Sequence, residues 1–290
     1  MNRLTIIGNL TRTPEARATA DGNTVSDYDA EEIKRKFSIS TSVAPIFWKN
    51  KKINLVDTPG TLDFSGEVLE GLRVCGTALI VMDAKSGVDV GSELAWDKAT
   101  EMGVPKAFFV NKMDDDNANF GNTIEQMRET FGQAICPVAI PIIVDRKPLG
   151  YADLITMKGY EYVKDGSLKE MQIPEASMAK ILSFRDMLME ALALTGDDLM
   201  EKFFAGEEFT QEEMHEAMNK GIIDGTIAPV MVGSASTLMG ITPLMDIIAD
   251  SFPNPLDRKG EKDENGEYPE DSVHGRVMAK LRQFNEAQDE

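Results

Sequence analysis

The sequence has few of the side chains that bind metals or crosslink a chain. Its 290 residues include two cysteines and two histidines. Cys75 and Cys136 lie far apart, each beside apolar residues, which favours two reduced core thiols over a disulfide. His215 and His274 have no second ligand at the spacing that zinc sites use. We therefore expect neither a disulfide nor a zinc site.

Positive charge is also scarce, with 30 Lys and Arg against 49 Asp and Glu, a formal net charge of −19. This balance opposes broad binding to phosphate backbones, although residues 34–36 form one local basic run. No apolar run approaches the roughly 18 residues that a membrane span needs. The apolar segment 4–8 is too short and wrongly flanked for a signal peptide. These features predict a cytoplasmic protein without a membrane partner, for which single-stranded DNA is an unlikely ligand.

Short apolar runs alternate with longer segments of helical period, and 42% hydrophobic residues are enough for a full core. Strands alternating with helices predict an α/β fold, in which a mostly parallel sheet is covered by helices on both faces. The expected strands are residues 53–57, 78–82, 107–110 and 229–233, and the expected helices are residues 64–75, 91–102 and 241–251.

The stretch before the last of these strands has a different character. Residues 140–144 and 159–163 are β-like, and residues 174–221 are strongly helical, which predicts an inserted α+β subdomain packed on the main sheet. Residues 257–271 are charged and broken by Gly and Pro, as in a linker. The expected divisions are an atypical N-terminal segment (1–20), a main domain (21–144 and 226–255), an inserted subdomain (145–225), and a polar tail or truncated start of a following domain (256–290).

The motif Asp-Thr-Pro-Gly, from Asp57 to Gly60, directly follows a buried strand. Open α/β sheets bind ligands at the carboxyl ends of their strands. There, Asp57 can hold Mg²⁺ through water, and the Gly60 backbone N–H can reach a γ-phosphate. Pro-Gly also makes ordinary turns, so this motif alone is weak.

Two further motifs also follow strands. Asn111-Lys112-Met-Asp114 suits guanine, because the Asp114 carboxylate can accept two N–H bonds from the base, while the Lys112 stem lies over it and Asn111 ties loops together. Alone, this motif is equally a charged helix cap. Ser234-Ala235 offers a backbone N–H to guanine O6. The order of the three motifs, each after a buried strand, predicts a guanine-nucleotide site.

Residues 21–45, 53–68, 103–114 and 233–255 resemble elongation factor G, a translational GTPase, and especially its divergent paralogues. The resemblance spans residues 21–255 and implies a P-loop-GTPase-like fold, GTP/GDP and Mg²⁺ as cofactors, the ribosome as partner, and GTP hydrolysis coupled to translocation. It makes residues 145–225 similar to the subdomain that the family inserts into its GTPase domain. It also implies that residues 21–45 are switch I, that Ser38 takes the position of a Mg²⁺-linked Thr, and that Asp57 opens switch II.

The sequence departs from this family in three places. The P-loop, GxxxxGK[ST], is absent: Gly8 fits its beginning, but residues 13–15 read Thr-Pro-Glu where Gly-Lys-Thr should stand. Thr61 occupies the position at which this family commonly has His. The sequence therefore leaves the catalytic residue unknown. Nothing after Pro255 resembles the β-barrel that follows the GTPase domain. Without the P-loop Lys and the catalytic His, we expect a GTPase impaired in binding and hydrolysis.

The first 25 residues or so resemble the opening of bacterial single-stranded DNA-binding protein. An OB-fold needs five strands, and the next four do not follow. The aromatic residues that stack bases in such a groove are sparse. The strand at residues 4–7 could instead complete the edge of the main sheet. Two other functions thus remain open: a nucleotide-blind binding module that acts through the inserted subdomain, and single-stranded DNA binding through the N-terminus.

Overall fold

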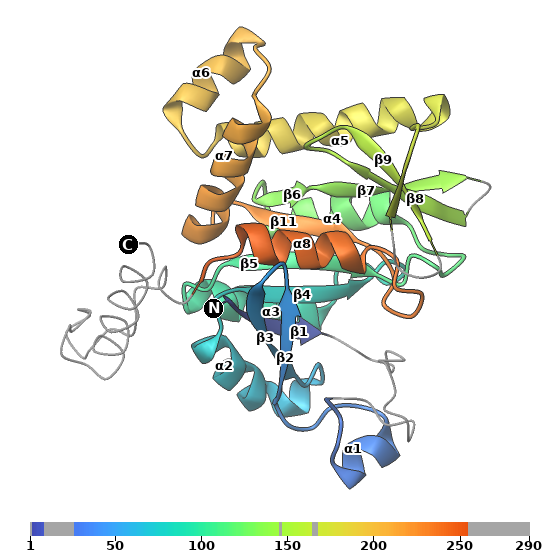
Figure 1. Ribbon diagram of the computed structural model, residues 1–290. Helices are drawn as coiled ribbons and strands as arrows, with labels where there is room; N and C mark the ends of the chain where they lie inside the picture. The colour runs from blue at the N-terminus through green and yellow to red at the C-terminus, as the bar shows by residue number, and fades with distance from the viewer. Residues whose placement is uncertain (1, 9–25, 145–146, 164–167, 255–290) are drawn as a thin grey trace, which may run out of the picture.

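A seven-stranded sheet forms the centre of the computed structural model, which describes residues 2–8, 26–144, 147–163 and 168–254 (Figure 1). The strand order is β2-β3-β1-β4-β5-β11-β6, and all neighbours are parallel except the antiparallel pair β2–β3. The mostly parallel sheet that the sequence predicts is therefore confirmed. Its strands are β1 (Asn2–Gly8), β2 (Ser42–Trp48), β3 (Lys51–Thr58), β4 (Ala78–Asp83), β5 (Lys106–Asn111), β6 (Ile135–Pro137) and β11 (Ala228–Val232).

The N-terminal strand β1 lies inside this sheet and not at its edge, which corrects the expectation from the sequence. It pairs with β3 on one side, with Ile6 opposite Asp57, and with β4 on the other, with Gly8 opposite Val81. A short apolar run does not distinguish a central from an edge strand, because its partners lie far away in the sequence. The chain thus leaves β1 at the point where the strand order reverses, which is where α/β sheets bind ligands.

The expectations for residues 9–20 and 256–290 lie outside the described residues.

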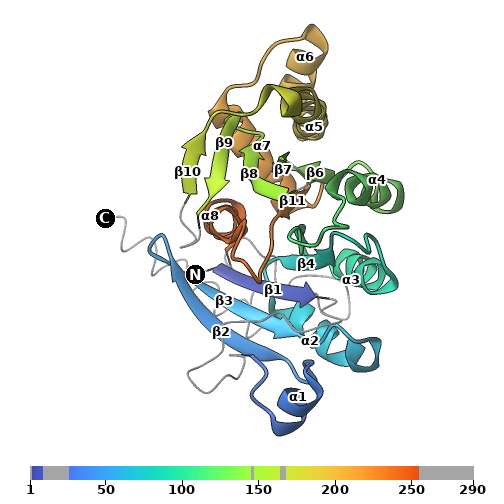
Figure 2. The same cartoon turned by 90° about the vertical axis from the view of Figure 1, so that its right-hand side faces the viewer.

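Helices cover both faces of the large sheet, as the sequence predicts (Figure 2). The helices α2, α3 and α4 lie along one face, and α8 lies along the other. Lys51 and Trp48 fix α8 to the β2–β3 hairpin, since the Lys51 ammonium donates to the Ala249 carbonyl and the Trp48 indole N–H donates to Asp246, 2.7 Å away. These helices are α2 (Ser65–Val74), α3 (Val90–Glu101), α4 (Phe120–Phe131) and α8 (Ile241–Ser251).

A second, antiparallel sheet and three helices form the inserted part of the chain. The sheet order is β10-β9-β8-β7, and α5 packs against β6 and β7 (Figure 1). Only Val138 separates β6 of the large sheet from β7 of the second one, so the apolar run contains no turn that would mark the boundary. These elements are β7 (Ala139–Val144), β8 (Lys147–Asp153), β9 (Lys158–Tyr162), β10 (Leu168–Met171), α5 (Glu175–Ala193), α6 (Asp197–Ala205) and α7 (Gln211–Asp224). In the part of the chain that the structure describes, no helix has the length and apolar character of a membrane span.

Candidate functional site

Three sequence motifs meet along the carboxyl edge of the large sheet. Asp57 stands near the end of β3, Asn111 at the end of β5, and Gly233 directly after β11. The strand registers place Asp83 beside Asn111, and Val232 beside Val110. Because parallel strands present their carboxyl ends at the same edge, the polar side chains that follow them gather on one side of the fold.

Asn111 joins the two loops that are expected to read guanine. Its side chain is buried, and its Oδ1 accepts the Ala235 backbone N–H at 2.8 Å. The Met113 N–H also donates to the Gly233 carbonyl at 3.0 Å. The structure therefore shows Asn111 tying loops together, and it shows the Ala235 N–H turned to Asn111. The O6 atom of a bound guanine would have to share the Ala235 N–H with Asn111 Oδ1 or displace Oδ1 from it.

Asp114 is exposed at the same edge, where a serine pair orients its carboxylate. The Ser236 hydroxyl donates to Asp114 Oδ2 at 3.1 Å and lies 2.9 Å from the fully buried Ser234 hydroxyl. The serine hydroxyl uses one acceptor site of Asp114 Oδ2, and the remaining sites on the two carboxylate oxygens can accept N–H groups from a ligand. Ser236 was missed by the sequence reasoning, since its only signal was a position two residues after Ser234.

Lys112 forms an ion pair with Asp83, the last residue of β4, at 2.9 Å. Burial alone would raise the pKa of the Asp83 carboxyl, but hydrogen bonds from Lys112 and from the Lys85 and Ser86 N–H groups outweigh it and lower the pKa. This ion pair fixes the Lys112 side chain at the carboxyl ends of the neighbouring strands β4 and β5. The sequence analysis also missed Asp83, although an acid at the end of a buried apolar run is a signal of a residue at the carboxyl edge of the sheet.

The loop after β11 is built around two glycines. A Cβ on Gly233 would stand 2.0 Å from the Met239 carbonyl oxygen, and Gly240 has a left-handed φ of +75°. The Ser234 N–H donates to that same Met239 oxygen at 2.8 Å. The backbone of this loop is therefore closed on itself, and this closure sets the position of Ala235.

Asp57 lies in an acidic environment near the carboxyl end of β3. Burial raises the pKa of its carboxyl to about 6; a hydrogen bond with Ser26 opposes this shift, and the charges of Asp27 and Glu32 add to it. Glu32 is itself buried and holds the backbone of this region, because its Oε1 accepts the N–H groups of Ile39 and Ser40 at 2.9 and 3.0 Å.

Ser38, the residue expected beside Mg²⁺, donates its hydroxyl to Asp27 Oδ1 at 2.7 Å. Since Asp27 also acts electrostatically on Asp57, the structure brings Ser38 and Asp57 into one neighbourhood. Among the described residues, no group of three or more His, Cys, Asp or Glu side chains is arranged to hold a metal. Mg²⁺ in nucleotide sites takes only one or two protein oxygens and completes its shell with water and phosphate, so Ser38 and Asp57 fit it.

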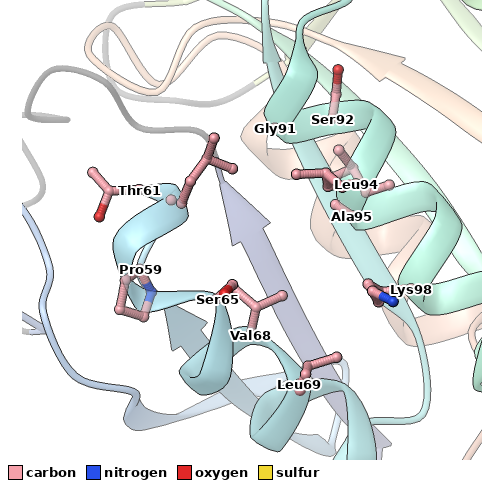
Figure 3. Close-up of a pocket in the computed structure, with 13 residues that line it drawn as sticks. Pro59, Thr61, Ser65, Val68, Leu69, Gly91, Ser92, Leu94, Ala95 and Lys98 are labelled. Atoms are coloured by element: carbon pink, nitrogen blue, oxygen red, sulfur yellow. The ribbon is translucent and has the colours of Figure 1, made fainter.

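Gly60 and Thr61 border an apolar pocket of about 230 Å³ between α2 and α3 (Figure 3). Thr61 points away from Leu94 and Ala95 on α3, and its hydroxyl oxygen is buried without a hydrogen-bond partner among the described residues. A threonine hydroxyl reaches less far than an imidazole, and nothing in the geometry gives Thr61 a proton acceptor. The described residues thus supply no group in the place of the histidine that is common in the family.

The raised pKa of Asp57 predicts a pH-dependent effect of Asp57→Asn on stability. The pKa is about 6 in the folded protein and about 3.9 in an unfolded chain, so protonation stabilises the fold below pH 4 and this contribution is lost as the pH rises through 6. Two pKa units correspond to at most about 3 kcal/mol. The asparagine stays neutral, so at pH 8 the variant should be more stable than the wild type by up to that amount, with little difference at pH 4.

Urea unfolding of the wild type and of Asp57→Asn at both pH values measures this effect. The matched control is Asp63→Asn, which changes an exposed carboxylate and should leave the pH dependence unaltered. A difference between Asp57→Asn and wild type that is the same at pH 4 and pH 8 would contradict a raised pKa at Asp57.

The arrangement of strand-end motifs is that of a guanine-nucleotide domain, and the comparisons with known proteins agree. The chain belongs to the elongation factor Tu GTP binding domain family, whose model matches residues 2–254. The match begins in β1, ahead of residue 21, where the motifs first indicated the resemblance.

The chain is similar to elongation factor G of Chlamydia trachomatis serovar D, with 38% identity over 254 residues, which cover 85% of this chain and 37% of that protein. It is 36% identical over 241 residues to elongation factor G of Ureaplasma parvum serovar 3, covering 82% of this chain and 35% of that protein. A crystal structure of a Thermus thermophilus protein superposes with a TM-score of 0.80 at 29% identity, covering 90% of this chain and 41% of that one. The chain spans little more than a third of the length of these curated relatives.

Proposed function

We propose that the chain is a guanine-nucleotide-binding domain whose hold on the base exceeds its hold on the phosphates. The hydrogen bond between Asn111 Oδ1 and the Ala235 N–H carries this proposal, because it assembles the two base-reading loops at one edge of the sheet. Asp114, fixed by Ser236, supplies the acceptor for the base N–H groups, and Lys112, fixed by Asp83, supplies the stem that covers it. Ser234 closes the loop behind them.

The weakness on the phosphate side follows from the sequence after Gly8. A P-loop provides several backbone N–H bonds and one Lys, all to charged oxygens. Each such bond contributes about 1.5–3 kcal/mol, so the loss of three or four costs at least about 5 kcal/mol. At about 1.4 kcal/mol per tenfold, this turns a micromolar site into a roughly millimolar one. Asp57 and the Gly60 N–H remain as the contacts to Mg²⁺ and the γ-phosphate.

Hydrolysis should be impaired further than binding. The P-loop Lys stabilises negative charge that develops on the transferred phosphoryl group, and this sequence has Thr-Pro-Glu at residues 13–15 where the family has Gly-Lys-Thr. Thr61 lacks the reach to position a water as a histidine does. Mg²⁺, held by Asp57 and Ser38 with phosphate oxygens, would supply charge neutralisation when bound. By family membership we infer a cytoplasmic role in protein biosynthesis with the ribosome as partner.

Calorimetric titration of GTP and of ATP, each with and without Mg²⁺, tests this function. We expect GTP to bind with millimolar affinity and ATP to bind more weakly, because adenine cannot offer Asp114 the adjacent N–H donors that guanine carries on N1 and N2. Asp114→Asn should abolish the preference for GTP, since two charge-assisted bonds account for about 3–6 kcal/mol, or more than a hundredfold. Asp116→Asn, an exposed carboxylate two residues away, is the matched control and should keep the preference.

Two outcomes would reject the proposal. An absence of heat with millimolar GTP and Mg²⁺, in a protein whose melting temperature GTP does not raise, would favour a nucleotide-blind binding module. Equal affinities of the wild type for GTP and ATP would show that the base-reading loops do not read guanine. Tight binding of a labelled single-stranded oligonucleotide at moderate salt would support the N-terminal alternative instead.

A further inference from the structure

A second cavity, of about 310 Å³, lies between the inserted part of the chain and the large sheet. Its walls come from the second sheet (Tyr151, Asp153 and Tyr160), from α7 (His215) and from α8 (Asp246 and Asp250). It is separate from the strand-end edge, and neither the proposed nucleotide chemistry nor the family match assigns it a ligand. Its volume is at the lower end of the range for small-molecule sites, which limits a ligand to a few heavy atoms.

The charge of the lining is unbalanced. Three carboxylates, Asp153, Asp246 and Asp250, line the cavity, and the described residues of its lining include no lysine or arginine. Lys49 pairs with Asp246 at 3.0 Å and with Asp250 at 2.7 Å, and Lys51 lies 4.0 Å from Asp250. Three negative charges against two positive ones leave one negative charge at the cavity.

Asp153 is the carboxylate without an ion-pair partner among the described residues. Its Oδ1 accepts the N–H groups of Ile155 and Thr156 at 2.8 and 3.2 Å, which fixes the side chain at the turn after β8. No hydrogen bond within the described part of the chain engages its second oxygen. That oxygen can accept a hydrogen bond from a cation in the cavity.

Tyr151 is a second and independent feature that points to a ligand. The residue is 5% exposed and lines the cavity, and its hydroxyl has no hydrogen-bond partner among the described residues. Burial, and then the charges of Asp153, Tyr160, Tyr162 and Asp246, raise the pKa of Tyr151, so the phenol stays neutral. A phenol hydroxyl can both donate and accept hydrogen bonds, and this one lines a space in which a ligand can supply the partner.

Aromatic rings complete the surroundings that favour a cation. The Tyr151 and Tyr160 rings stack with centroids 5.3 Å apart, and Tyr162 lies 5.8 Å from Tyr151. A ring face attracts an ammonium group electrostatically, and carboxylates beside such rings add charge-assisted hydrogen bonds. The α8 carboxylates already bind one ammonium in this protein, that of Lys49, which is not among the lining residues.

We propose that this cavity binds a small alkylammonium ligand. One ammonium group donates to Asp153 and to the Tyr151 hydroxyl oxygen, and the alkyl chain packs along the apolar lining, which includes Met218 and Met231. The tyrosine hydroxyl then accepts one hydrogen bond and the carboxylate another, so each of the two groups gains a partner. The site is specific for positive charge because a neutral ligand leaves the single excess negative charge of the cavity unpaired.

Titration of the whole chain with cadaverine, followed by calorimetry and by ligand-observed NMR, tests this inference. The control ligand is 1,5-pentanediol, which has the same length and no charge. The titration is done at pH 8. We expect saturable binding of cadaverine with one ligand per chain, and at least tenfold weaker binding of the diol.

Two variants and two controls decide whether this cavity is the site. Asp153→Asn keeps the turn, because an asparagine oxygen can still accept the two N–H groups, but it removes the charge; it should weaken cadaverine binding at least tenfold. Tyr151→Phe removes only the hydroxyl and should also weaken binding. Asp63→Asn and Tyr28→Phe change exposed residues elsewhere and should have no effect. Melting curves verify that each variant folds, and Asp153→Asn decides the matter if Tyr151→Phe does not.

Several results would overturn the inference. These are equal binding of the diol and the diamine, wild-type affinity of Asp153→Asn, or uptake of cadaverine that does not saturate and vanishes with moderate salt. The last result would identify ordinary counterions around a chain of net charge −19. Since GTP binding plays no part in the titration, failure here leaves the proposed nucleotide function unaffected.

Discussion

Replacing residues 9–20 with a segment that carries GxxxxGK[ST] and a following helix is expected to raise the affinity for GTP about a thousandfold or more. The physical reason is the position of β1, which runs between β3 and β4 and ends at Gly8 opposite Val81. A loop inserted there would start between Asp57 and the base-reading loops. Three or four backbone N–H bonds to phosphate oxygens contribute at least about 5 kcal/mol, which corresponds to a few thousandfold.

Calorimetry with GTP, GDP and ATP would measure the gain. A matched graft in which the loop Lys is replaced by Ala separates the charge of that side chain from the backbone contacts, and it should recover only part of the gain. Because the base-reading loops are unchanged, the preference for guanine should persist in both grafts. A folded graft that binds GTP no better than the original chain would show that the phosphate-facing end of β1 does not address the same ligand as Asn111 and Asp114.

The sequence predicts the central strands β4, β5 and β11 of the large sheet well, because each of them is a continuous apolar run. All residues of β5 and of β11 are buried, so these strands lack the alternation that half-exposed strands show. The motifs after them are predictable for the same reason, since a polar residue at the end of a buried run marks the carboxyl edge. The helix α4 was missed, although Phe120, Ile124, Met127 and Phe131 recur at helical spacing after the Asn119 cap.

The links between the motifs could not be predicted, because they join residues far apart in the sequence. The hydrogen bond from Ala235 to Asn111 spans 124 residues, and that from Ser236 to Asp114 spans 122. No periodicity or propensity encodes such a contact, which depends on how two strand ends lie side by side. The interior position of β1 was unpredictable for the same reason, since its neighbours β3 and β4 come after it by some fifty and seventy residues.

Gly233→Ala is expected to destabilise the protein and to remove the preference for guanine together. A Cβ at this position would lie 2.0 Å from the Met239 carbonyl oxygen and 3.0 Å from the Gly240 Cα, both backbone atoms that no side-chain rotation can move away. The loop must therefore shift, at a cost of about 1–3 kcal/mol or more. That shift strains the Ser234 bond to Met239 and displaces the Ala235 N–H, which Asn111 holds in place.

The two effects of Gly233→Ala have one cause, so they should appear together. Urea unfolding measures the first, and the ratio of GTP to ATP affinity measures the second. Gly66→Ala is the control: it lies in α2 with no heavy atom within 4 Å of the new Cβ, and it should stabilise the helix by about 0.5–1 kcal/mol without changing the ratio. If Gly233→Ala unfolded at the wild-type urea concentration, the closed loop would not be what positions Ala235. If it were unstable yet kept its preference for GTP, guanine would be recognised by Asp114 alone, because Asp114 takes its position from Ser236 and from the end of β5 and does not depend on the displaced N–H.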